Sequence, residues 1–323
     1  MRNYIIRRAL INIPVILLVA TLVFFATNAL PGDFVAERIA QNNPTEGGPE
    51  ERAAQIQRIR EDLGLDRSIP VRYVDYITSL MRGDFGTSYQ SGRSALADFK
   101  AGVPYTLQLS IMAFAVALVT SIPIGVISAI RQDSFVDYFL RFFAILALAA
   151  PSFWVGTMIL LYVVRWDLWH VPITSRPLLW ESPGDSIRLF IIPAVAGGLA
   201  GGAPIMRLLR SQMLEVLRQD YVRTAWAKGL RERAVILRHA FKNALIPVVT
   251  VIGFGIATLI SGNVIFEYIF NIPGVGNRIL AAIRARDVPV VQAFVIIIAT
   301  VVVFVNLAID VLYAYIDPRI RYS

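Results

Sequence analysis

The 323-residue chain contains no cysteine and only two histidines, and charged residues make up just 17% of it. The absence of cysteine excludes structural disulfides, thiolate metal sites and cysteine nucleophiles. The two histidines, His170 and His239, lie far apart and have no second histidine at a metal-ligand spacing, so we predict no metal site. Soluble domains contain about 25% charged residues. A hydrophobic content of 56% with so little charge indicates a membrane protein.

Six apolar stretches without a charged residue organise the chain. They comprise residues 9–32, 101–130, 142–164, 189–206, 243–266 and 288–309. An α-helix rises about 1.5 Å per residue and the hydrocarbon core of a bilayer is about 30 Å thick, so about 20 residues cross it. Because backbone groups find no water in that core, each stretch is expected to be helical. The sequence therefore predicts an all-α, polytopic membrane protein with six transmembrane helices.

The first stretch follows a basic N-terminus, as the apolar core of a secretory signal peptide does. It is longer than a typical signal core, and no Ala-x-Ala cleavage pattern directly follows it. We therefore expect an uncleaved first helix.

The distribution of lysine and arginine predicts the orientation of the chain. Residues 207–242 carry nine basic and three acidic residues, and the N-terminus is also basic. Because cytoplasmic segments are enriched in lysine and arginine, we expect both termini and residues 207–242 on the cytoplasmic side. Residues 33–100 then lie outside, although three arginines between residues 278 and 286 oppose the rule. The net charge of +8 is accordingly assigned to topology, and no nucleic acid partner is expected.

Residues 33–100 are expected to form an external insertion between the first two membrane helices. Apolar residues recur at spacings of three and four over residues 50–63, which predicts a helix that stops at Gly64. A further short helix is expected around residues 73–80. A flexible loop is the alternative for this region.

Residues 207–242 are expected to contain a short helix outside the membrane. Residues 221–228 have good helix propensity, Asp220 suits the first turn, and Gly229 suits a helix end. A helix this short needs a partner to bury its apolar face, and its small residues allow that partner to approach closely.

Four different blocks of residues lie in order along nearly the whole chain. They are Leu30, Pro31, Gly32 and Asp33; Gly83, Asp84, Phe85, Gly86, Thr87 and Ser88; the run from Asp220 to Leu230 with His239 and Asn243; and Glu267, Phe270, Pro273, Gly274 and Gly276 with Asp317, Pro318 and Arg319. Together these blocks resemble the inner-membrane permease subunits of binding-protein-dependent ABC importers of the dipeptide, oligopeptide and nickel branch.

The resemblance implies that the third block is the coupling helix, which docks into a groove of an ATPase subunit. The expected ATPase-coupling residues are Asp220, Tyr221, Arg223, Thr224, Ala225, Lys228 and Gly229. Trp226 departs from the family, which usually has arginine at this position, and it indicates a more apolar contact. The alternative is a basic juxtamembrane helix that lies on anionic lipid.

The chain has no Gly-x-x-x-x-Gly-Lys-Ser/Thr phosphate loop. Its glycine-rich stretch, residues 197–202, includes no lysine. We expect these glycines to allow close helix packing instead. The resemblance then implies that ATP and Mg bind to two partner ATPase subunits. A second homologous permease, an external substrate-binding protein and membrane lipid are the other expected partners. No cofactor and no catalytic residue are expected in this chain itself.

Polar residues inside or at the edge of the apolar stretches are the candidates for lining a substrate pathway. They are Gln108, Asn263, Asn306 and Asp310. Asp310 suits an ion pair with an arginine equally well.

The sequence thus predicts one transmembrane domain over residues 1–323, which forms half of the pathway of an ATP-driven importer. Alternating access is the expected mechanism, in a bacterial or archaeal inner membrane. Di- or oligopeptides are the expected substrates, and nickel chelates, glutathione or oligosaccharides are the alternatives. An ion-driven secondary transporter is the rival class, but it needs charged residues in mid-span, and the six stretches lack them.

Overall fold

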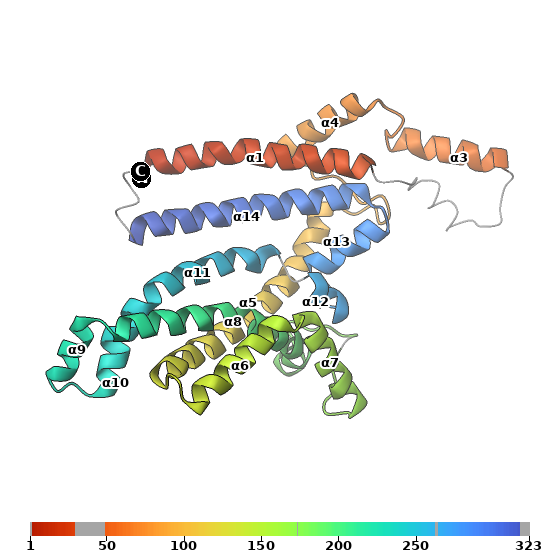
Figure 1. The fold of residues 1–323 in the computed structure, drawn as a ribbon. Coiled ribbons are helices and arrows are strands. Elements are labelled where there is room, and N and C mark those ends of the chain that lie inside the picture. The colour runs from red at the N-terminus through yellow and green to blue at the C-terminus, as the bar shows by residue number, and fades with distance from the viewer. Residues whose placement is uncertain (1, 30–48, 173, 262–263, 317–323) are drawn as a thin grey trace. The chain divides into compact units, whose positions relative to one another are not determined.

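The computed structural model describes residues 2–29, 49–172, 174–261 and 264–316, which are helices joined by turns (Figure 1). The one pairing of extended backbone among them is an isolated bridge between Thr87 and Ser94. The chain divides into two compact units. The first contains residues 1–101 and 278–307, and the second contains residues 102–277. The all-α, polytopic fold class expected from the sequence is confirmed.

The helices of the first unit come from both ends of the chain. They are α1 (Arg2–Ala29), α3 (Pro49–Asp62), α4 (Ile69–Met81), the first turns of α5 (Ala95–Ile130), most of α13 (Val275–Arg284) and most of α14 (Val288–Ile316). The two short helices expected in the insertion are therefore confirmed as α3 and α4. Gly64 adopts a φ of +64°, a left-handed conformation that suits glycine and ends α3.

Aromatic and polar contacts hold the first unit together. Phe24 of α1 packs against Tyr73 and Tyr76 of α4, with ring centroids 5.4 Å apart in both cases. Gln292 of α14 donates a 2.7 Å hydrogen bond to Thr27 of α1. These contacts place the insertion helix α4 and the last membrane helix on the same first helix.

The second unit contains the rest of the chain that the structure describes. After α5 its helices are α6 (Phe135–Ala149), α7 (Ser152–Arg165), α8 (Pro183–Leu217), α9 (Asp220–Ala227), α10 (Glu232–Ala234), the π-helical turn η1 (Val235–Ala240), α11 (Phe241–Ser261) and α12 (Val264–Ile269). Helix α8 is central: its buried residues contribute to both large apolar clusters of this unit.

Two of the glycines in residues 197–202 bring α8 against α5, as the sequence predicts. A Cβ atom added at Gly198 would lie 2.5 Å from the carbonyl oxygen of Ala113, and one added at Gly202 would lie 2.9 Å from that of Ala117. A Cβ at Gly201 would meet nothing within 4 Å. The close approach of α8 to α5 therefore depends on Gly198 and Gly202 and not on Gly201.

Five of the described helices are long and apolar enough to cross a membrane, and α6 and α7 together would make a sixth span. The five lie at residues 10–29, 95–130, 183–217, 232–253 and 288–308. The expectation of one continuous helix over residues 142–164 is wrong, because α6 and α7 meet at an angle of 99°. Pro151 lacks a backbone N–H and disfavours the helical conformation of the residue before it. Ala150 accordingly adopts an extended ψ of 130°, which ends α6.

Candidate functional site

Helix α9 is the short helix outside the apolar stretches that the sequence predicts. It begins after Gln219, whose extended backbone separates it from α8, and Asp220 supplies an acidic side chain in its first turn. It ends where Gly229 adopts a φ of +76° and donates its N–H to the carbonyl of Trp226 at 2.9 Å. A side chain at that φ is strained, so glycine stops the helix at this point.

One face of α9 packs against the chain itself. Val222 and Ala225 are buried with Val235 of η1, and the end of α8 covers them. The hydroxyl of Tyr221 accepts a 2.9 Å hydrogen bond from the amide of Asn243 on α11. The apolar face that the sequence assigns to a partner is thus filled from within, and α9 is fixed to the ends of two long helices.

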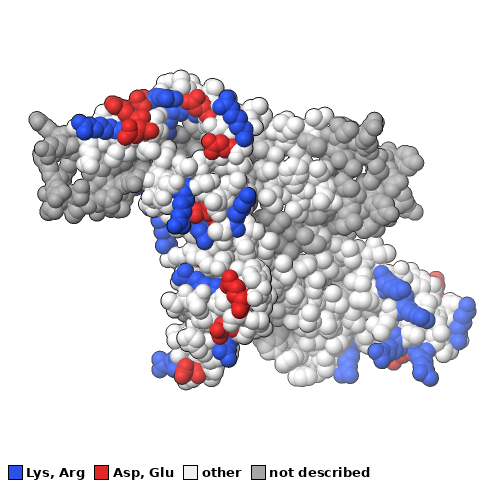
Figure 2. Space-filling view, turned by 180° about the vertical axis from the view of Figure 1, so that it is seen from behind, with Lys and Arg blue, Asp and Glu red and all other residues white. Residues whose placement is uncertain are grey.

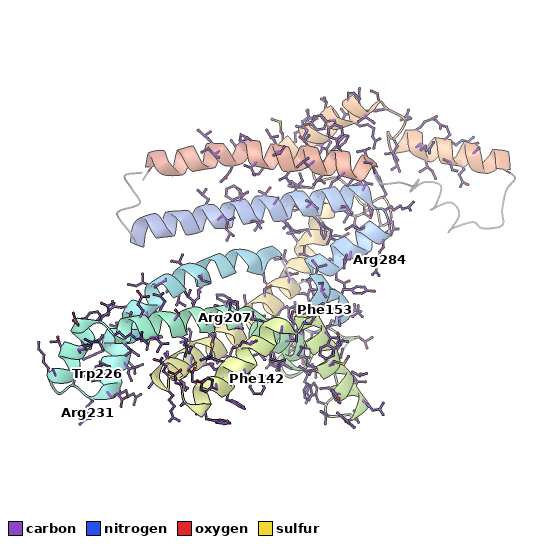
Figure 3. The ribbon with its side chains drawn as sticks, viewed as in Figure 1. Phe142, Phe153, Arg207, Trp226, Arg231 and Arg284 are labelled. Carbon is purple, nitrogen blue, oxygen red and sulfur yellow. The ribbon has the colours of Figure 1, made fainter. Side chains whose placement is uncertain are left out.

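The opposite face of α9 is exposed. The side chain of Asp220 is 97% accessible, and it lies 3.7 Å from that of Arg223, which is 69% accessible. Thr224, Lys228 and Gly229 are also exposed. Trp226, on the same helix, is 41% exposed, and Tyr221 and the neighbouring Leu230 are exposed to a similar degree (Figure 3).

Six of the seven residues expected to couple to an ATPase therefore offer exposed surface on or beside one short helix. Ala225 points into the chain, so its small side chain contributes to packing within this unit.

The surroundings of α9 are basic. Figure 2 shows blue side chains gathered over this end of the second unit, with few red ones among them. Arg218, Arg223, Lys228, Arg231 and Arg233 are all exposed. A protein surface that docks here has to present acidic or neutral groups at its rim.

Of the four residues expected to line a pathway, the structure describes the side chains of Gln108 and Asn306. Gln108 is buried, donates to the hydroxyl of Ser186 at 2.7 Å and accepts from the backbone N–H of Leu179 at 2.9 Å. Both ends of its amide are thus used in joining α5 to the start of α8. Asn306 is exposed on α14, in the other unit. Asn263 and the side chain of Asp310 lie outside the described residues.

A buried ion pair between α6 and α8 is a feature that the sequence did not predict. Asp137 of α6 is fully buried and accepts hydrogen bonds from Nε and Nη2 of Arg210 on α8, at 3.0 and 2.7 Å. Ser128 of α5 also donates to this carboxylate, and Arg141 lies 3.6 Å from it. Three helices therefore meet at one carboxylate, seven residues before the end of α8. The local signal was Ser134 followed three residues later by Asp137, a pattern typical of a helix start.

A second buried carboxylate, Glu267, organises the segment between α12 and α13. It accepts from the hydroxyl of Thr106 at 2.6 Å and from the backbone N–H of Asn277 at 2.9 Å. Thr106 in turn accepts from the N–H of Val275 at 2.8 Å. Burial raises the pKa of the Glu267 carboxyl above its ordinary value, while these donors oppose the shift. Glu267 entered the sequence analysis only as part of a family resemblance, and no local pattern indicated Thr106 as its partner.

No group of three or more histidine, aspartate or glutamate side chains in the described part of the chain is arranged to hold a metal ion. The buried polar clusters described above join helices to one another. The exposed face of α9, in contrast, presents charged and polar side chains to the outside of the chain. This arrangement is that of a helical membrane protein with one short helix exposed outside its candidate spans.

The chain belongs to the family of binding-protein-dependent transport system inner membrane components, which matches residues 121–322. Residues 1–110 match the N-terminal part described for the same kind of membrane component. The chain is thus an inner-membrane permease subunit of an ABC importer, as the four sequence blocks indicate.

Its relatives include two kinds of permease. The dipeptide transport system permease protein DppB of Escherichia coli (strain K12) is 36% identical over 345 residues, which cover all of both chains. The glutathione transport system permease protein GsiC is 36% identical in Pectobacterium atrosepticum and 37% identical in Salmonella typhimurium, over 323 residues that again cover all of both chains.

Proposed function

We propose that α9 docks on a separate ATPase subunit and transmits its motion to the membrane helices. The observation that carries this proposal is the division of α9 into two faces. Val222 and Ala225 fix it to α8 and η1, while Asp220, Arg223 and Thr224 remain exposed. A helix held in this way moves together with α8 and η1, on which it packs.

The driving reaction belongs to another polypeptide, because residues 197–202 lack the lysine of a phosphate-binding loop and form the interior of α8. ATP and Mg bind to two copies of that ATPase subunit. A second homologous permease completes the pathway. Two conformations that differ in their affinity for the ATPase are sufficient for alternating access.

An external binding protein delivers the substrate to the face that carries the insertion of residues 33–100. Both chain termini and residues 207–242 then lie on the cytoplasmic side of a bacterial or archaeal inner membrane. The whole of residues 1–323 acts as one transmembrane domain.

Di- or oligopeptides are the substrate class that we infer. The relatives named above are permeases for dipeptides and for glutathione, which is itself a short peptide with one unusual linkage. Glutathione is therefore the first alternative, and nickel chelates or oligosaccharides follow it. Uptake of labelled peptides is measured in cells that carry the complete transporter. Unlabelled glutathione, nickel chelates and oligosaccharides are added in turn, and the extent to which each one reduces uptake ranks the substrate classes.

A charge placed on the exposed face of α9 tests the docking proposal. Thr224→Glu adds a carboxylate that an ATPase groove would have to bury without a partner, which is unfavourable. We expect the ATPase that co-purifies with the tagged full complex to fall about tenfold or more. Gly229→Glu is expected to act in the same direction, although its φ of +76° also strains the helix end.

Gln132→Glu is the matched control, because it adds the same charge at an exposed turn between α5 and α6. It is expected to leave ATPase recovery unchanged. Equal recovery of ATPase with Thr224→Glu and with wild type, at equal amounts of inserted protein, would exclude α9 as the docking surface.

A test of the energy source separates the importer from an ion-driven transporter. Uptake by the reconstituted complex is expected to require internal ATP and the external binding protein, and to continue when ionophores collapse ion gradients. Uptake without ATP that stops with the ionophores contradicts the proposal.

A further inference from the structure

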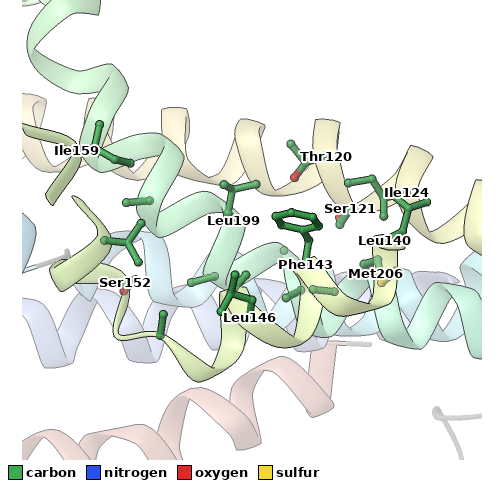
Figure 4. Close-up of a pocket in the computed structure, with 18 residues that line it drawn as sticks. Thr120, Ser121, Ile124, Leu140, Phe143, Leu146, Ser152, Ile159, Leu199 and Met206 are labelled. Atoms are coloured by element: carbon green, nitrogen blue, oxygen red, sulfur yellow. The ribbon is translucent and has the colours of Figure 1, made fainter. Parts of the chain in front are cut away.

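The second unit contains an apolar groove that the proposed function does not use. It lies between α5, α6, α7 and α8 and has a volume of about 360 Å³ (Figure 4). Its walls are aliphatic and aromatic side chains, among them Phe143, Leu199 and Met206. The polar side chains that line it are hydroxyls, and no charged group lines it. The groove is therefore suited to hydrocarbon.

A basic recess of about 320 Å³ adjoins this groove. It is lined by Arg141 of α6, by Arg207 and Arg210 of α8, and by two apolar residues. Ala144 lines both the groove and the recess, so the two cavities are neighbours along α6. Figure 3 shows where Arg207 lies on α8.

The recess has an excess of positive charge. Arg210 and Arg141 share the carboxylate of Asp137. Arg207 forms no ion pair with any residue that the structure describes, and its side chain is exposed. Asp133 is the further acid near enough to interact with Arg210. Three guanidinium groups thus face two carboxylates, and an anion would balance the remaining charge.

We propose that the recess and the groove together bind one anionic phospholipid. Its phosphate lies among the three arginines, and one acyl chain lies in the groove beside Ala144. Guanidinium groups bind phosphate through paired hydrogen bonds. Basic pockets between membrane helices recognise anionic head groups in this way.

A peptide substrate and a helix of a second permease fit these observations less well. The backbone groups of a peptide would lie unpaired against the aliphatic walls of the groove, which is unfavourable. An apolar helix would fill the groove, but it would leave the charge of the recess unbalanced. The lipid satisfies both parts of the cavity with one molecule.

Native mass spectrometry of the purified full chain tests this site without ATP or partner subunits. The protein is stripped of lipid in mild detergent and supplied with phosphatidylglycerol or with phosphatidylcholine of the same acyl chains. We expect one phosphatidylglycerol to be retained about tenfold more strongly than phosphatidylcholine. Arg207→Gln is expected to remove most of that difference, since it deletes the guanidinium without a described carboxylate partner. Ala144→Phe is expected to weaken binding of the lipid, because its ring would occupy space beside both the groove and the recess.

Arg188→Gln is the matched control, because it removes an exposed arginine from the other end of the same helix. It is expected to bind lipid as the wild type does. Equal retention of both lipids, or no effect of Arg207→Gln in a monodisperse protein, overturns the proposal.

Two competitors separate the lipid from other occupants. Inorganic phosphate at millimolar concentration is expected not to displace phosphatidylglycerol, because it cannot fill the groove. Displacement of phosphatidylglycerol by phosphate, or binding of this lipid to Ala144→Phe as strong as to wild type, would mean that the recess binds an anion alone. Either result overturns the lipid proposal. Displacement by a dipeptide assigns the groove to the substrate pathway and overturns it as well. A failure here leaves the docking role of α9 untouched.

Discussion

Glu267 illustrates at the residue scale how one buried side chain organises a loop. Its carboxylate accepts from Thr106 and from the backbone N–H of Asn277, and Gly274 and Gly276 leave the space that it occupies. A Cβ atom at Gly274 would collide with the Glu267 carboxylate, and one at Gly276 would collide with Val264 and lie 3.0 Å from Oε2 of Glu267. The loop between α12 and α13 is thus built around this group.

Removal of the carboxylate is expected to destabilise the protein. Glu267→Ala leaves the donors of Thr106 and Asn277 without their acceptor, which costs about 1–3 kcal/mol. Thermal denaturation of the detergent-solubilised chain measures the loss. Glu267→Gln keeps an acceptor oxygen and is expected to retain most of the stability. A melting temperature of Glu267→Ala equal to that of wild type would contradict this account.

The raised pKa of Glu267 also predicts a pH dependence. An acid whose pKa is higher in the folded state stabilises the fold below its ordinary value of 4.5, and this contribution is lost as the pH rises through the folded value. We therefore expect the melting temperature of wild type to fall relative to that of Glu267→Gln as the pH is raised above 4.5. The same slope in both proteins would assign the pH dependence to other groups.

Gly198 and Gly201 offer a matched pair for testing helix contact. In both, alanine improves helix propensity by about 1 kcal/mol. At Gly198 the added Cβ meets the backbone of α5, whereas at Gly201 it meets nothing within 4 Å. Gly198→Ala is therefore expected to lower the melting temperature, and Gly201→Ala to leave it unchanged or raise it. Equal shifts in the two variants would show that α5 and α8 do not approach closely at this point.

At the scale of elements, α8 connects the membrane core to the exposed helix α9. Asp137 of α6 and Ser128 of α5 are both bound to Arg210 near the end of α8. Val216 and Leu217 at that end then pack on Val222 and Ala225 of α9. One buried ion pair and one apolar cluster thus connect α8 to α5, α6 and α9.

Loss of this ion pair is expected to be costly. Asp137→Ala leaves the guanidinium of Arg210 without its main partner and is expected to cost about 3–5 kcal/mol. Asp185→Ala removes the acid of an exposed pair with Arg188 and is expected to cost about 0–1 kcal/mol. Melting temperatures of the two variants measure the contrast. Similar losses in both would mean that burial of Asp137 does not matter.

At the scale of the whole molecule, the proposed orientation of the chain rests on its charge distribution. The absence of cysteine makes the protein suited to single-cysteine labelling. A membrane-impermeant maleimide added to spheroplasts is expected to label Ser91→Cys, and to label Gln132→Cys and Arg231→Cys only after permeabilisation. All three positions are exposed in the chain itself. Labelling in the reverse order would invert the proposed topology.

Local sequence patterns predicted much of the element structure. The helices α3 and α9 and their glycine stops at Gly64 and Gly229 were predicted because helix propensity and left-handed glycine act within a few residues. The break between α6 and α7 was missed because hydropathy alone runs uninterrupted through Pro151. The proline was visible, but a proline inside an apolar run does not by itself decide between a kinked span and a sharp bend.

The sequence by itself determined that the chain is a helical membrane protein of an importer family, because apolar length and local residue blocks are properties of contiguous segments. The tertiary structure decided which polar groups meet. Arg210 and Asp137 are separated by 73 positions, and Glu267 and Thr106 by 161. It also decided that Ala225 of α9 faces the chain while Thr224 faces outward. Pairing across such distances and the rotation of a short helix depend on packing in three dimensions, which no local pattern encodes.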